Sequence, residues 1–444
     1  MTDLVIHGQR ILTPEGIRPG CVHVRLGKIV AVTTLDVVPP TSLFVSAGDN
    51  VVMPGMIDTH VHINEPGRTE WEGFVTATRA AAAGGVTTLF DMPLNSIPAT
   101  TTVAGLQAKR AAAQGRTMVN VGFIGGVVPG NAADLAALHG EGVTMFKCFL
   151  TPSGVEEFPP VSEPDLRIAM PILATLDATL MVHAELSEHL VPTPAGDPRH
   201  YATYLASRPD AAETEAVALM IRLAEEFGTR VHIVHVSSAA TIPLLREARL
   251  RGVKISAETC PHYLSFSAEQ IADGETQFKS APPIRDKATR DALWHALLAG
   301  ELDQIVSDHS PCPPSMKEGA GGDFFAAWGG VASLRLTLPA VWHEAKARGV
   351  TLENIAKWMC SAPADLAGLG HRKGRLAAGY DADIIIWDSE AQVSVDDMTL
   401  YNKHPLTPYF GRTLTGEIRS TYVGGMEVYR DGIMGSGAPG RLIN

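Results

Sequence analysis

The chain has 444 residues, of which 45% are hydrophobic and 19% charged, so it has enough apolar material for a large core and is unlike a disordered protein. Its 36 Lys and Arg against 48 Asp and Glu give a net charge of −12, which argues against nucleic acid as a partner. No apolar run of about 18 residues is present, so we expect no membrane partner. Five cysteines without CxxC spacing predict a reducing compartment. We therefore expect a soluble cytoplasmic enzyme.

Residues 1–50 contain short β-type runs separated by turns, as in LVIHGQRILT and CVHVRLGKIVAV, and the start of the chain lacks the apolar core of a signal peptide. This segment is too small to bury a stable core by itself. We expect it to pack against another β segment of the chain.

From 51 to 370, short β-branched apolar runs alternate with longer stretches of helical period, such as 70–85 and 214–228. The expected strands lie at 51–63, 86–92, 118–127, 143–150, 178–185, 230–237, 254–260 and 302–310. Runs that are apolar on both faces are typical of parallel sheets. Eight repeats of strand and helix predict an α/β fold with a (β/α)8 TIM-like barrel, completed by helices at 333–348 and 351–368.

Residues 371–444 return to β-type sequence, as in GRLAAGYDADIIIWD and STYVGGMEVYRDG. Since neither end of the chain is large enough for a core, we predict that both form one small β-sandwich beside the barrel. The expected organisation is therefore 1–50 and 371–444 as the two parts of the sandwich and 51–370 as the barrel.

Active sites of such barrels lie at the C-terminal ends of the strands, so we looked for polar residues there. His60 and His62 end the first predicted strand. Residues i and i+2 share one face of a strand, so both imidazoles are expected to project to one side. Two neutral imidazoles on one face suit Zn²⁺ or a similar metal, and the alternative is a pair of hydrogen-bonded interior histidines.

Two further histidines, His183 and His235, follow the fifth and sixth predicted strands. Taken singly, each is more typical of a hydrogen-bonded core histidine. Four histidines at the same end of one barrel favour a shared metal site. His232 lies three positions before His235, so we expect it on the opposite face of the strand and leave it out of the site.

Lys147 stands inside the apolar run VTMFKCFL, where an unpaired ammonium is costly to desolvate. Burial favours a neutral, nucleophilic amine. Three interpretations remain open for this lysine. It forms an ion pair with a carboxylate of a neighbouring strand, it forms a Schiff base, or it carries CO2 as a carbamate that bridges two metals.

Asp308 ends the eighth predicted strand, in VSDHSPC. A carboxylate at this place can ligate a metal and also take a proton from an attacking water. The alternative is a helix cap or a structural partner of His309. Together, these residue types suit two metal ions and the metal-assisted hydrolysis of an amide-like bond.

The chain as a whole resembles the cyclic-amide branch of the amidohydrolase superfamily, which includes dihydroorotases, hydantoinases and allantoinases. The motifs are PGMIDTHVH (54–62), VHAE (182–185), HVSS (235–238), SDHSPC (307–312) and GRLAAGYDADIIIWD (374–388), with the lone Lys147. The resemblance implies that His60, His62 and Asp308 ligate one metal and that His183 and His235 ligate the other. It also implies that carboxylated Lys147 bridges both metals, and that Asp308 passes a proton from a metal-bridging hydroxide to the leaving nitrogen.

Within this branch the run NEPGRTEWEGFVTATRAAAAGGVTTLFDMPLNSIPATT (64–101) is similar to the allantoinases, as are HYATYLASRP, CPHYLSF and SAPPIRD. The resemblance implies that allantoin is the substrate and allantoate the product. Dihydroorotases have an arginine two residues after HxH that binds the substrate carboxylate, whereas this chain has Asn64. The absence of that arginine favours a neutral cyclic ureide as the substrate, although the nearby Arg68 also carries a positive charge.

The resemblance also implies that Asn64, Asn95 and Ser280 bind substrate; the alternative is that they form turns or caps. It implies a homo-oligomer, as tetramers are common among such proteins. The two metals are expected to be Zn²⁺, with Mn²⁺, Co²⁺ or Fe²⁺ also suited to the ligands. Cys148, Cys260 and Cys312 are expected to be small buried residues. The Gly- and Pro-rich 311–322 is a candidate mobile loop after the last strand.

Three functional hypotheses follow from these features. The first is an allantoinase with a binuclear site. The second is a hydantoinase- or dihydropyrimidinase-like enzyme, or a dihydroorotase-like one, acting on other cyclic amides. The third is a non-catalytic interaction protein on the same scaffold, which the presence of all six candidate metal-site residues disfavours.

Overall fold

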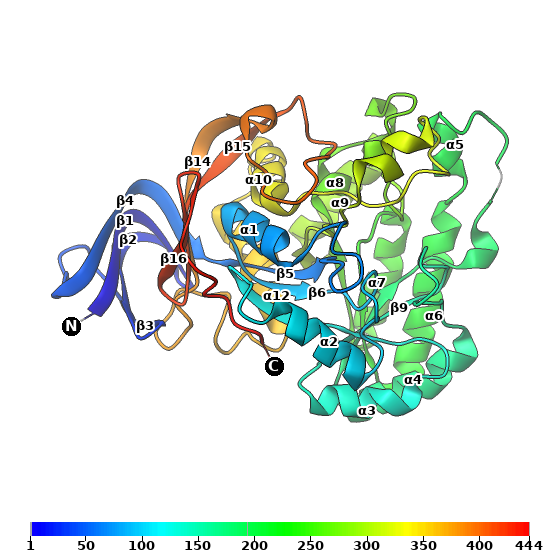
Figure 1. Cartoon of the computed structure of the whole chain (residues 1–444), viewed down its shortest axis with the longest axis horizontal. Helices are drawn as coiled ribbons and strands as arrows, with labels where there is room; N and C mark the ends of the chain where they lie inside the picture. The colour runs from blue at the N-terminus through cyan, green and yellow to red at the C-terminus, as the bar shows by residue number, and fades with distance from the viewer. Residues whose placement is uncertain (1, 193, 444) are drawn as a thin grey trace.

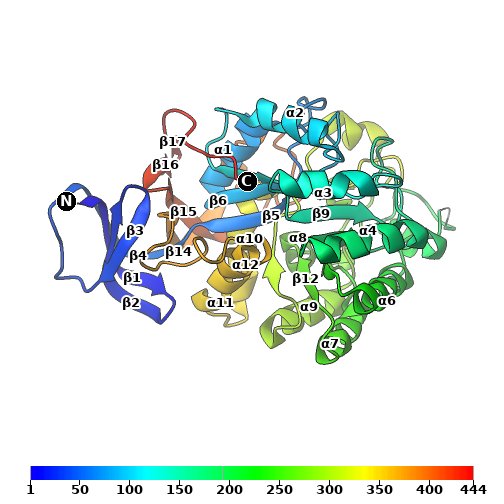
Figure 2. The ribbon, with the colours of Figure 1, turned by 90° about the horizontal axis from the view of Figure 1, so that it is seen from below.

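The computed structural model describes residues 2–192 and 194–443 and consists of a barrel surrounded by helices and a β module at one side (Figure 1). The view from below shows the N-terminal strands at one end of the molecule and helices α6 (Asp210–Phe227) and α7 (Ile242–Leu250) towards the other (Figure 2). The α/β class expected from the sequence is confirmed.

The barrel is built from parallel strands, each buried because helices cover the outside. They are β5 (Met56–Val61), β6 (Val86–Asp91), β7 (Asn120–Phe123), β8 (Gly125–Gly126), β9 (Met145–Phe149), β10 (Thr179–His183), β11 (Arg230–Ile233), β12 (Ile255–Thr259) and β13 (Gln304–Ile305). Only Ile124 separates β7 from β8, so within the described residues these strands occupy eight positions. A parallel bridge between Val61 and His309 joins the first position to the last. The predicted TIM-like barrel is confirmed.

The barrel helices alternate with the strands and turn an apolar face inward. They are α1 (Phe74–Gly84), α2 (Val103–Ala113), α3 (Ala132–Gly140), α4 (Glu163–Thr175), α5 (Tyr201–Ala206), α6 (Asp210–Phe227), α7 (Ile242–Leu250), α8 (Pro261–Ser265), α9 (Lys287–Ala299), α10 (Thr337–Ala347), α11 (Leu352–Ala356) and α12 (Ala362–Leu366). Side chains of Thr102, Ser162 and Asp286 cap α2, α4 and α9 at their N-termini. Among the residues described, no helix is both long and apolar enough to cross a membrane.

Both ends of the chain contribute to one β module, as the sequence predicted. Its strands form an eight-stranded sheet in the order β17-β16-β15-β14-β4-β1-β2-β3. Their bounds are β1 (Thr2–Thr13), β2 (Gly16–Arg25), β3 (Lys28–Thr33), β4 (Thr41–Pro54), β14 (Ile384–Ser394), β15 (Thr413–Val423), β16 (Met426–Arg430) and β17 (Ile433–Met434). Strand β4 joins the two halves, because it pairs with β1 on one side and with β14 on the other.

One residue, Gly55, separates β4 from the first barrel strand β5. Its amide donates a hydrogen bond to the carbonyl of Asp383, at 2.9 Å. A Cβ added to Gly55 would lie 2.3 Å from side-chain atoms of Thr87, so this junction accepts only glycine without rearrangement. The β module is therefore connected directly to the strand that ends in the HxH pair.

The β module also packs against the barrel helices. Trp387 of β14 is fully buried, and its ring meets that of Trp342 of α10 edge-on, with 5.5 Å between centroids. The Trp342 indole donates a hydrogen bond to the carbonyl of Ser389, at 2.9 Å. The Thr421 hydroxyl of β15 donates to the carbonyl of Ala82 of α1, at 2.7 Å.

This packing predicts that Trp387→Ala lowers the free energy of unfolding by about 3–5 kcal/mol, because it leaves a cavity where the β module meets α10. Urea denaturation followed by circular dichroism measures the change. Leu250→Ala serves as the control, since Leu250 is 82% exposed, and we expect a change below about 0.5 kcal/mol. Equal effects of the two substitutions would contradict the packing described.

Candidate metal centre

The six candidate metal-site residues all lie at the C-terminal end of the barrel. His60, Lys147 and His183 stand on β5, β9 and β10, and the remaining three closely follow β5, β11 and β13. All six side chains are buried. With the exception of Lys147, they line a cavity of about 740 Å³, whose other walls include Asn95, Phe149, Tyr204, Arg208, Lys279 and Trp328.

The first group, here called half-site 1, comprises His60, His62 and Asp308. The Oδ1 atom of Asp308 lies 3.2 Å from Nε2 of His60 and 3.5 Å from Nε2 of His62. Burial lowers the pKa of His62 to about 4 against the opposing effect of its hydrogen bond to Asp308, so its imidazole is neutral at pH 7. Three ligand atoms converging within 4.8 Å of one another can hold one metal ion.

The second group, half-site 2, comprises His183 and His235. Nδ1 of His183 lies 3.0 Å from Nε2 of His235, close to the separation of about 3.3 Å between two nitrogens on one tetrahedral zinc ion. Burial lowers the pKa of both imidazoles below the usual value, which leaves them neutral and able to bind metal. The ring of Phe149 stacks on His183, with 4.5 Å between centroids.

Lys147 is fully buried close to these histidines. Within the described part of the chain its Nζ has no hydrogen-bond partner, and it lies 5.0 Å from the ring centroid of Phe149. Burial lowers the pKa of this amine to about 8, against the attraction of Asp308 and Glu258. A direct ion pair with a neighbouring carboxylate is therefore not what holds Lys147 in place.

The two half-sites lie side by side. The ring centroids of His60 and His235 are 5.4 Å apart, which is similar to the 5.5 Å between His60 and His62 within half-site 1. An unpartnered buried amine, four imidazoles and a carboxylate form a donor set that fits divalent transition metals. The residues present therefore fit the metal-dependent chemistry that the sequence suggested.

Two of these residues stand on turns with unusual backbone geometry. His235 has a φ of 40° and Asp308 a φ of 44°, both in the left-handed region that residues other than glycine rarely adopt. The amides of Ser237 and Ser238, just after His235, both donate to the carboxylate of Glu213 at 3.1 Å. These hydrogen bonds hold the turn in place.

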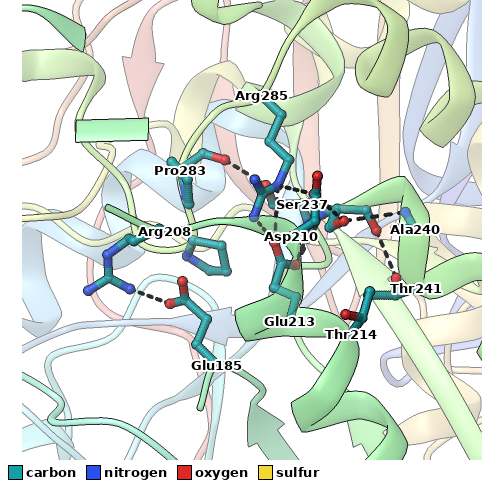
Figure 3. Close-up of polar contacts among 12 residues, drawn as sticks. Glu185, Arg208, Asp210, Glu213, Thr214, Ser237, Ala240, Thr241, Pro283 and Arg285 are labelled. Atoms are coloured by element: carbon teal, nitrogen blue, oxygen red, sulfur yellow. Dashed lines mark hydrogen bonds and ion pairs between the residues drawn. The ribbon is translucent and has the colours of Figure 1, made fainter. Parts of the chain in front are cut away.

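Glu213 is buried with the guanidinium of Arg285, whose Nη2 lies 2.7 Å from its Oε1 (Figure 3). The Ser237 hydroxyl donates to the carbonyl of Pro283. The turn before Asp308 is held in a comparable way, because the Ser307 amide donates to both oxygens of Asp58, at 3.2 and 3.3 Å. Buried carboxylates thus fix the backbone beside both half-sites.

The structure adds two carboxylates that the sequence analysis missed. Glu258 on β12 places Oε1 2.7 Å from Nδ1 of His60. Glu185, two residues after His183, places Oε2 2.7 Å from Nε2 of that histidine and is also paired with Arg208 (Figure 3). A weaker signal for Glu258 was present, since it is a carboxylate near the C-terminal end of a predicted strand, 254–260.

The expectation that His232 faces away from the site is wrong. Nε2 of His232 lies 2.9 Å from Oε2 of Glu258, which also contacts His60. Strand β11 ends at Ile233, and the positive φ of His235 breaks the alternation of faces on which the expectation depended. His232 is therefore linked to His60 through Glu258.

The three residues expected to bind substrate have different surroundings. Asn95 lines the cavity, and its Nδ2 lies 3.3 Å from Nδ1 of His62. The Asn64 side chain donates to the carbonyl of Pro311, and the Ser280 hydroxyl donates to the carbonyl of Pro282. Asn64 and Asn95 have φ values of 67° and 66°, so both also occupy turn positions that favour asparagine.

Arg68, the other cation near position 64 that could bind an anionic substrate, is already paired. Its guanidinium binds the carboxylate of Glu157 and donates to the carbonyl of Asn95, at 3.0 Å. Arg68 is absent from the residues lining the cavity. Its charge is therefore balanced outside the cavity.

The segment 311–322 runs along the cavity, which Ser315, Met316, Gly319 and Ala320 line. Lys317, in its middle, is buried and donates hydrogen bonds from Nζ to the carbonyls of Thr276 and Lys279, at 3.1 and 3.2 Å. These contacts anchor the segment at one point. All five cysteines are free and buried, as expected for small interior residues.

Residues 51–428 match the family model described as the amidohydrolase family, so the chain belongs to the amidohydrolase family and is a hydrolase. The family recognised from the sequence motifs is thereby confirmed.

More specific similarities extend over nearly the whole chain. It is 47% identical to the allantoinase of Streptomyces avermitilis over 97% of this chain and 96% of that protein. It is 43% identical to the allantoinase of Arabidopsis thaliana, over 98% of this chain and 90% of that protein. Among solved structures, the L-hydantoinase (dihydropyrimidinase) of Arthrobacter aurescens aligns with a TM-score of 0.93 at 29% identity, covering 100% of this chain and 99% of that one.

The Glu185–Arg208 pair generates a prediction about acid stability. Burial disfavours the Glu185 carboxylate, but Arg208 and His183 outweigh burial and lower its pKa from 4.5 to about 2. A depressed pKa stabilises the fold above pH 4.5, and this contribution, about 3 kcal/mol, is lost as pH falls towards 2.

Urea unfolding in the presence of a chelator, at pH 7 and pH 4, measures this contribution. We expect wild type to be more stable than Glu185→Gln at pH 7 and expect the difference to shrink at pH 4. Glu188→Gln is the control, since the Glu188 side chain is 76% exposed and its loss should change stability little at either pH. A difference that grows on acidification would contradict the assignment.

Proposed function

We propose that the protein is an allantoinase, which hydrolyses the cyclic amide of allantoin to give allantoate. The observation that carries the proposal is the convergence of four histidines and an aspartate on one cavity, with Lys147 buried behind them, in a chain similar to allantoinases over nearly its whole length. A hydrolase of this family with such a cavity acts on a small-molecule substrate.

Two divalent ions complete the proposed site. His60, His62 and Asp308 would hold one ion, and His183 and His235 would hold the other. Lys147, carrying CO2 as a carbamate, would be a ligand shared by both. Its lowered pKa, about 8, supports this role, because the neutral amine is the form that adds to CO2, and the proton it loses leaves to solvent.

The bound ions would supply acidification of a water molecule and polarisation of the amide carbonyl. Asp308 then does the proton transfer. Its carboxylate stays ionised, because burial is outweighed by the surrounding histidines, which lower its pKa well below the usual range. It accepts one proton of the attacking water and passes it to the ring nitrogen as the carbon–nitrogen bond breaks. The water's second proton stays on the new carboxyl group and is released to solvent, which leaves a carboxylate on the product.

Positions 64 and 68 offer no free cation to an anionic ring, which favours a neutral substrate ring at this end of the cavity. Position 64 carries an asparagine, and Arg68 is neutralised by Glu157 outside the cavity. We propose that Asn95, which lines the cavity beside His62, binds the ureide ring. Asn64 and Ser280 are not among the lining residues, and we propose that they support the same subsite through the backbone carbonyls of Pro311 and Pro282 that they hold. An asparagine offers both a donor and an acceptor to a cyclic amide.

A second candidate is a hydantoinase- or dihydropyrimidinase-like activity on other cyclic ureides. The close structural similarity to the L-hydantoinase of Arthrobacter aurescens favours it, with a TM-score of 0.93. The same metal centre serves both reactions, so the walls of the cavity decide between the substrates.

Several finer assignments belong to this proposal. The native metal is zinc, for which histidine and carboxylate ligands are suited, although Mn²⁺, Co²⁺ and Fe²⁺ accept the same donors. The enzyme works as a homotetramer in the cytoplasm. The acidic surface, with a net charge of −12, is consistent with the absence of a nucleic-acid partner.

Metal removal and loss of Asp308 test the mechanism. We expect exhaustive chelation to abolish conversion of allantoin to allantoate, and added Zn²⁺ or Mn²⁺ to restore it. Asp308→Ala is expected to lower kcat by at least about 100-fold, because the proton acceptor and one metal ligand are lost together. Full activity of the variant, or of metal-free protein, would refute the mechanism.

Substrate choice distinguishes the two candidate functions. We expect kcat/KM for allantoin to exceed the values for hydantoin and dihydroorotate, measured side by side on the same metal-loaded preparation. Dihydroorotate is expected to be the poorest substrate. Its carboxylate would find an asparagine at position 64, and the guanidinium of Arg68 is already paired with Glu157. A preference for hydantoin of tenfold or more would favour the second candidate.

A further inference from the structure

His60 of half-site 1 and His183 of half-site 2 present opposite ring nitrogens to their half-sites. His60 turns Nε2 towards Asp308 and Nδ1 towards Glu258. His183 does the reverse, with Nδ1 towards His235 and Nε2 towards Glu185. In each ring, therefore, one nitrogen faces the proposed metal and the other faces a buried carboxylate.

We propose that Glu258 and Glu185 are positioning residues, each of which sets the ring tautomer of one histidine and thereby the metal affinity of one half-site. Glu258 commits His60 to bind metal through Nε2, and Glu185 commits His183 to bind through Nδ1. The inference rests on the binuclear centre proposed above.

The two carboxylates are hydrogen-bond acceptors only. An ionised carboxylate cannot donate a hydrogen bond, so the ring nitrogen that faces it must carry the proton. The other nitrogen of a neutral imidazole then has a free lone pair, as metal binding requires. Contacts of 2.7 Å in both half-sites are short enough for charge-assisted hydrogen bonds.

Glu258 is kept ionised and in place by donors on its other oxygen. Nε2 of His232 and Nε2 of Gln304 both lie 2.9 Å from Oε2, and Gln304 also contacts Thr59. Nδ1 of His232 lies 2.7 Å from the Ser256 hydroxyl, which can donate to it. Every member of this chain of contacts has a partner, so the chain fixes the direction of the His60 N–H bond.

Glu185 is held by a cation. Its Oε2 accepts a hydrogen bond from Arg208 (Figure 3). The same oxygen accepts one from His183, and Arg208 also lines the cavity. Glu185 itself is fully buried and does not line the cavity, and the same is true of Glu258. Neither carboxylate is placed to touch substrate, so both act through the histidines.

The consequence is that each carboxylate serves only its own half-site. Loss of Glu185 frees the proton of His183 to move to Nδ1 and block metal binding there, while His60 keeps its tautomer. Loss of Glu258 has the mirror effect. Partners of this kind typically contribute 10- to 100-fold to metal affinity.

The test is a metal titration. Wild type and variants of the full chain are stripped with a chelator and titrated with Zn²⁺ in competition with a chromophoric chelator. Glu185→Met and Glu258→Met remove the acceptor, and Glu185→Gln and Glu258→Gln keep an acceptor oxygen without the charge. We expect each variant to retain one tight ion and to bind the other about 10- to 100-fold more weakly, with Gln intermediate between Glu and Met.

The weakened ion is identified in chains that keep one half-site. With His62→Asn, only half-site 2 binds tightly, and we expect Glu185→Gln to weaken that ion and Glu258→Gln to leave it unchanged. With His235→Asn, the two effects are expected to exchange. Should these chains bind no ion, the titration of the chain with both half-sites decides alone.

A matched control is Asp383→Asn. Asp383 is a buried carboxylate paired with Lys373, and it accepts from the amide of Gly424 in the β module. We expect its loss to lower thermal stability while both zinc affinities remain as in wild type. The Gln variants carry the test if a Met variant fails to fold.

The outcomes separate the two proposals. A wild-type chain that binds fewer than two ions contradicts the binuclear centre itself. If wild type binds two ions and Glu185→Gln weakens both equally or neither, the positioning role is overturned. The same holds for Glu258→Gln.

Discussion

The proposed centre depends first on the closure of the barrel between its first and last strands. The amide of His62 donates to the carbonyl of His309 at 2.9 Å, and Val61 bridges His309. This contact brings Asp308 within reach of His60 and His62, although more than two hundred residues separate them along the chain. This closure brings the site residues together, and the helices, the β module and the buried carboxylates hold them in place.

Much of the fold could be predicted because its signals are local. Alternation of apolar strands and helices indicates a barrel, and polar residues at the strand ends indicate where its chemistry lies. The pairing of β4 with β1 and β14 could not be predicted, since strand order depends on contacts between distant segments. For the same reason, the sequence alone could not show that the guanidinium of Arg68 is paired with Glu157.

The prediction for the site was least complete around the metal-ligand candidates. His232 was misplaced because face alternation holds only within a strand, and β11 ends before His235. Glu185 ends the VHAE motif and Glu258 lies in a predicted strand, but the role of each depends on which ring nitrogen it faces. Residue type and spacing indicate the metal-binding chemistry, whereas tautomer and orientation require coordinates.

The single residue between β4 and β5 has a consequence for how the molecule moves as a whole. Gly55 leaves no linker between the sheet built from both chain ends and the strand that carries His60. A rotation of the β module would therefore pull directly on that strand, and the tight approach of Gly55 to Thr87 leaves little room for a hinge. The β module is therefore rigidly attached to the catalytic barrel, so neither part can be replaced or deleted independently of the other.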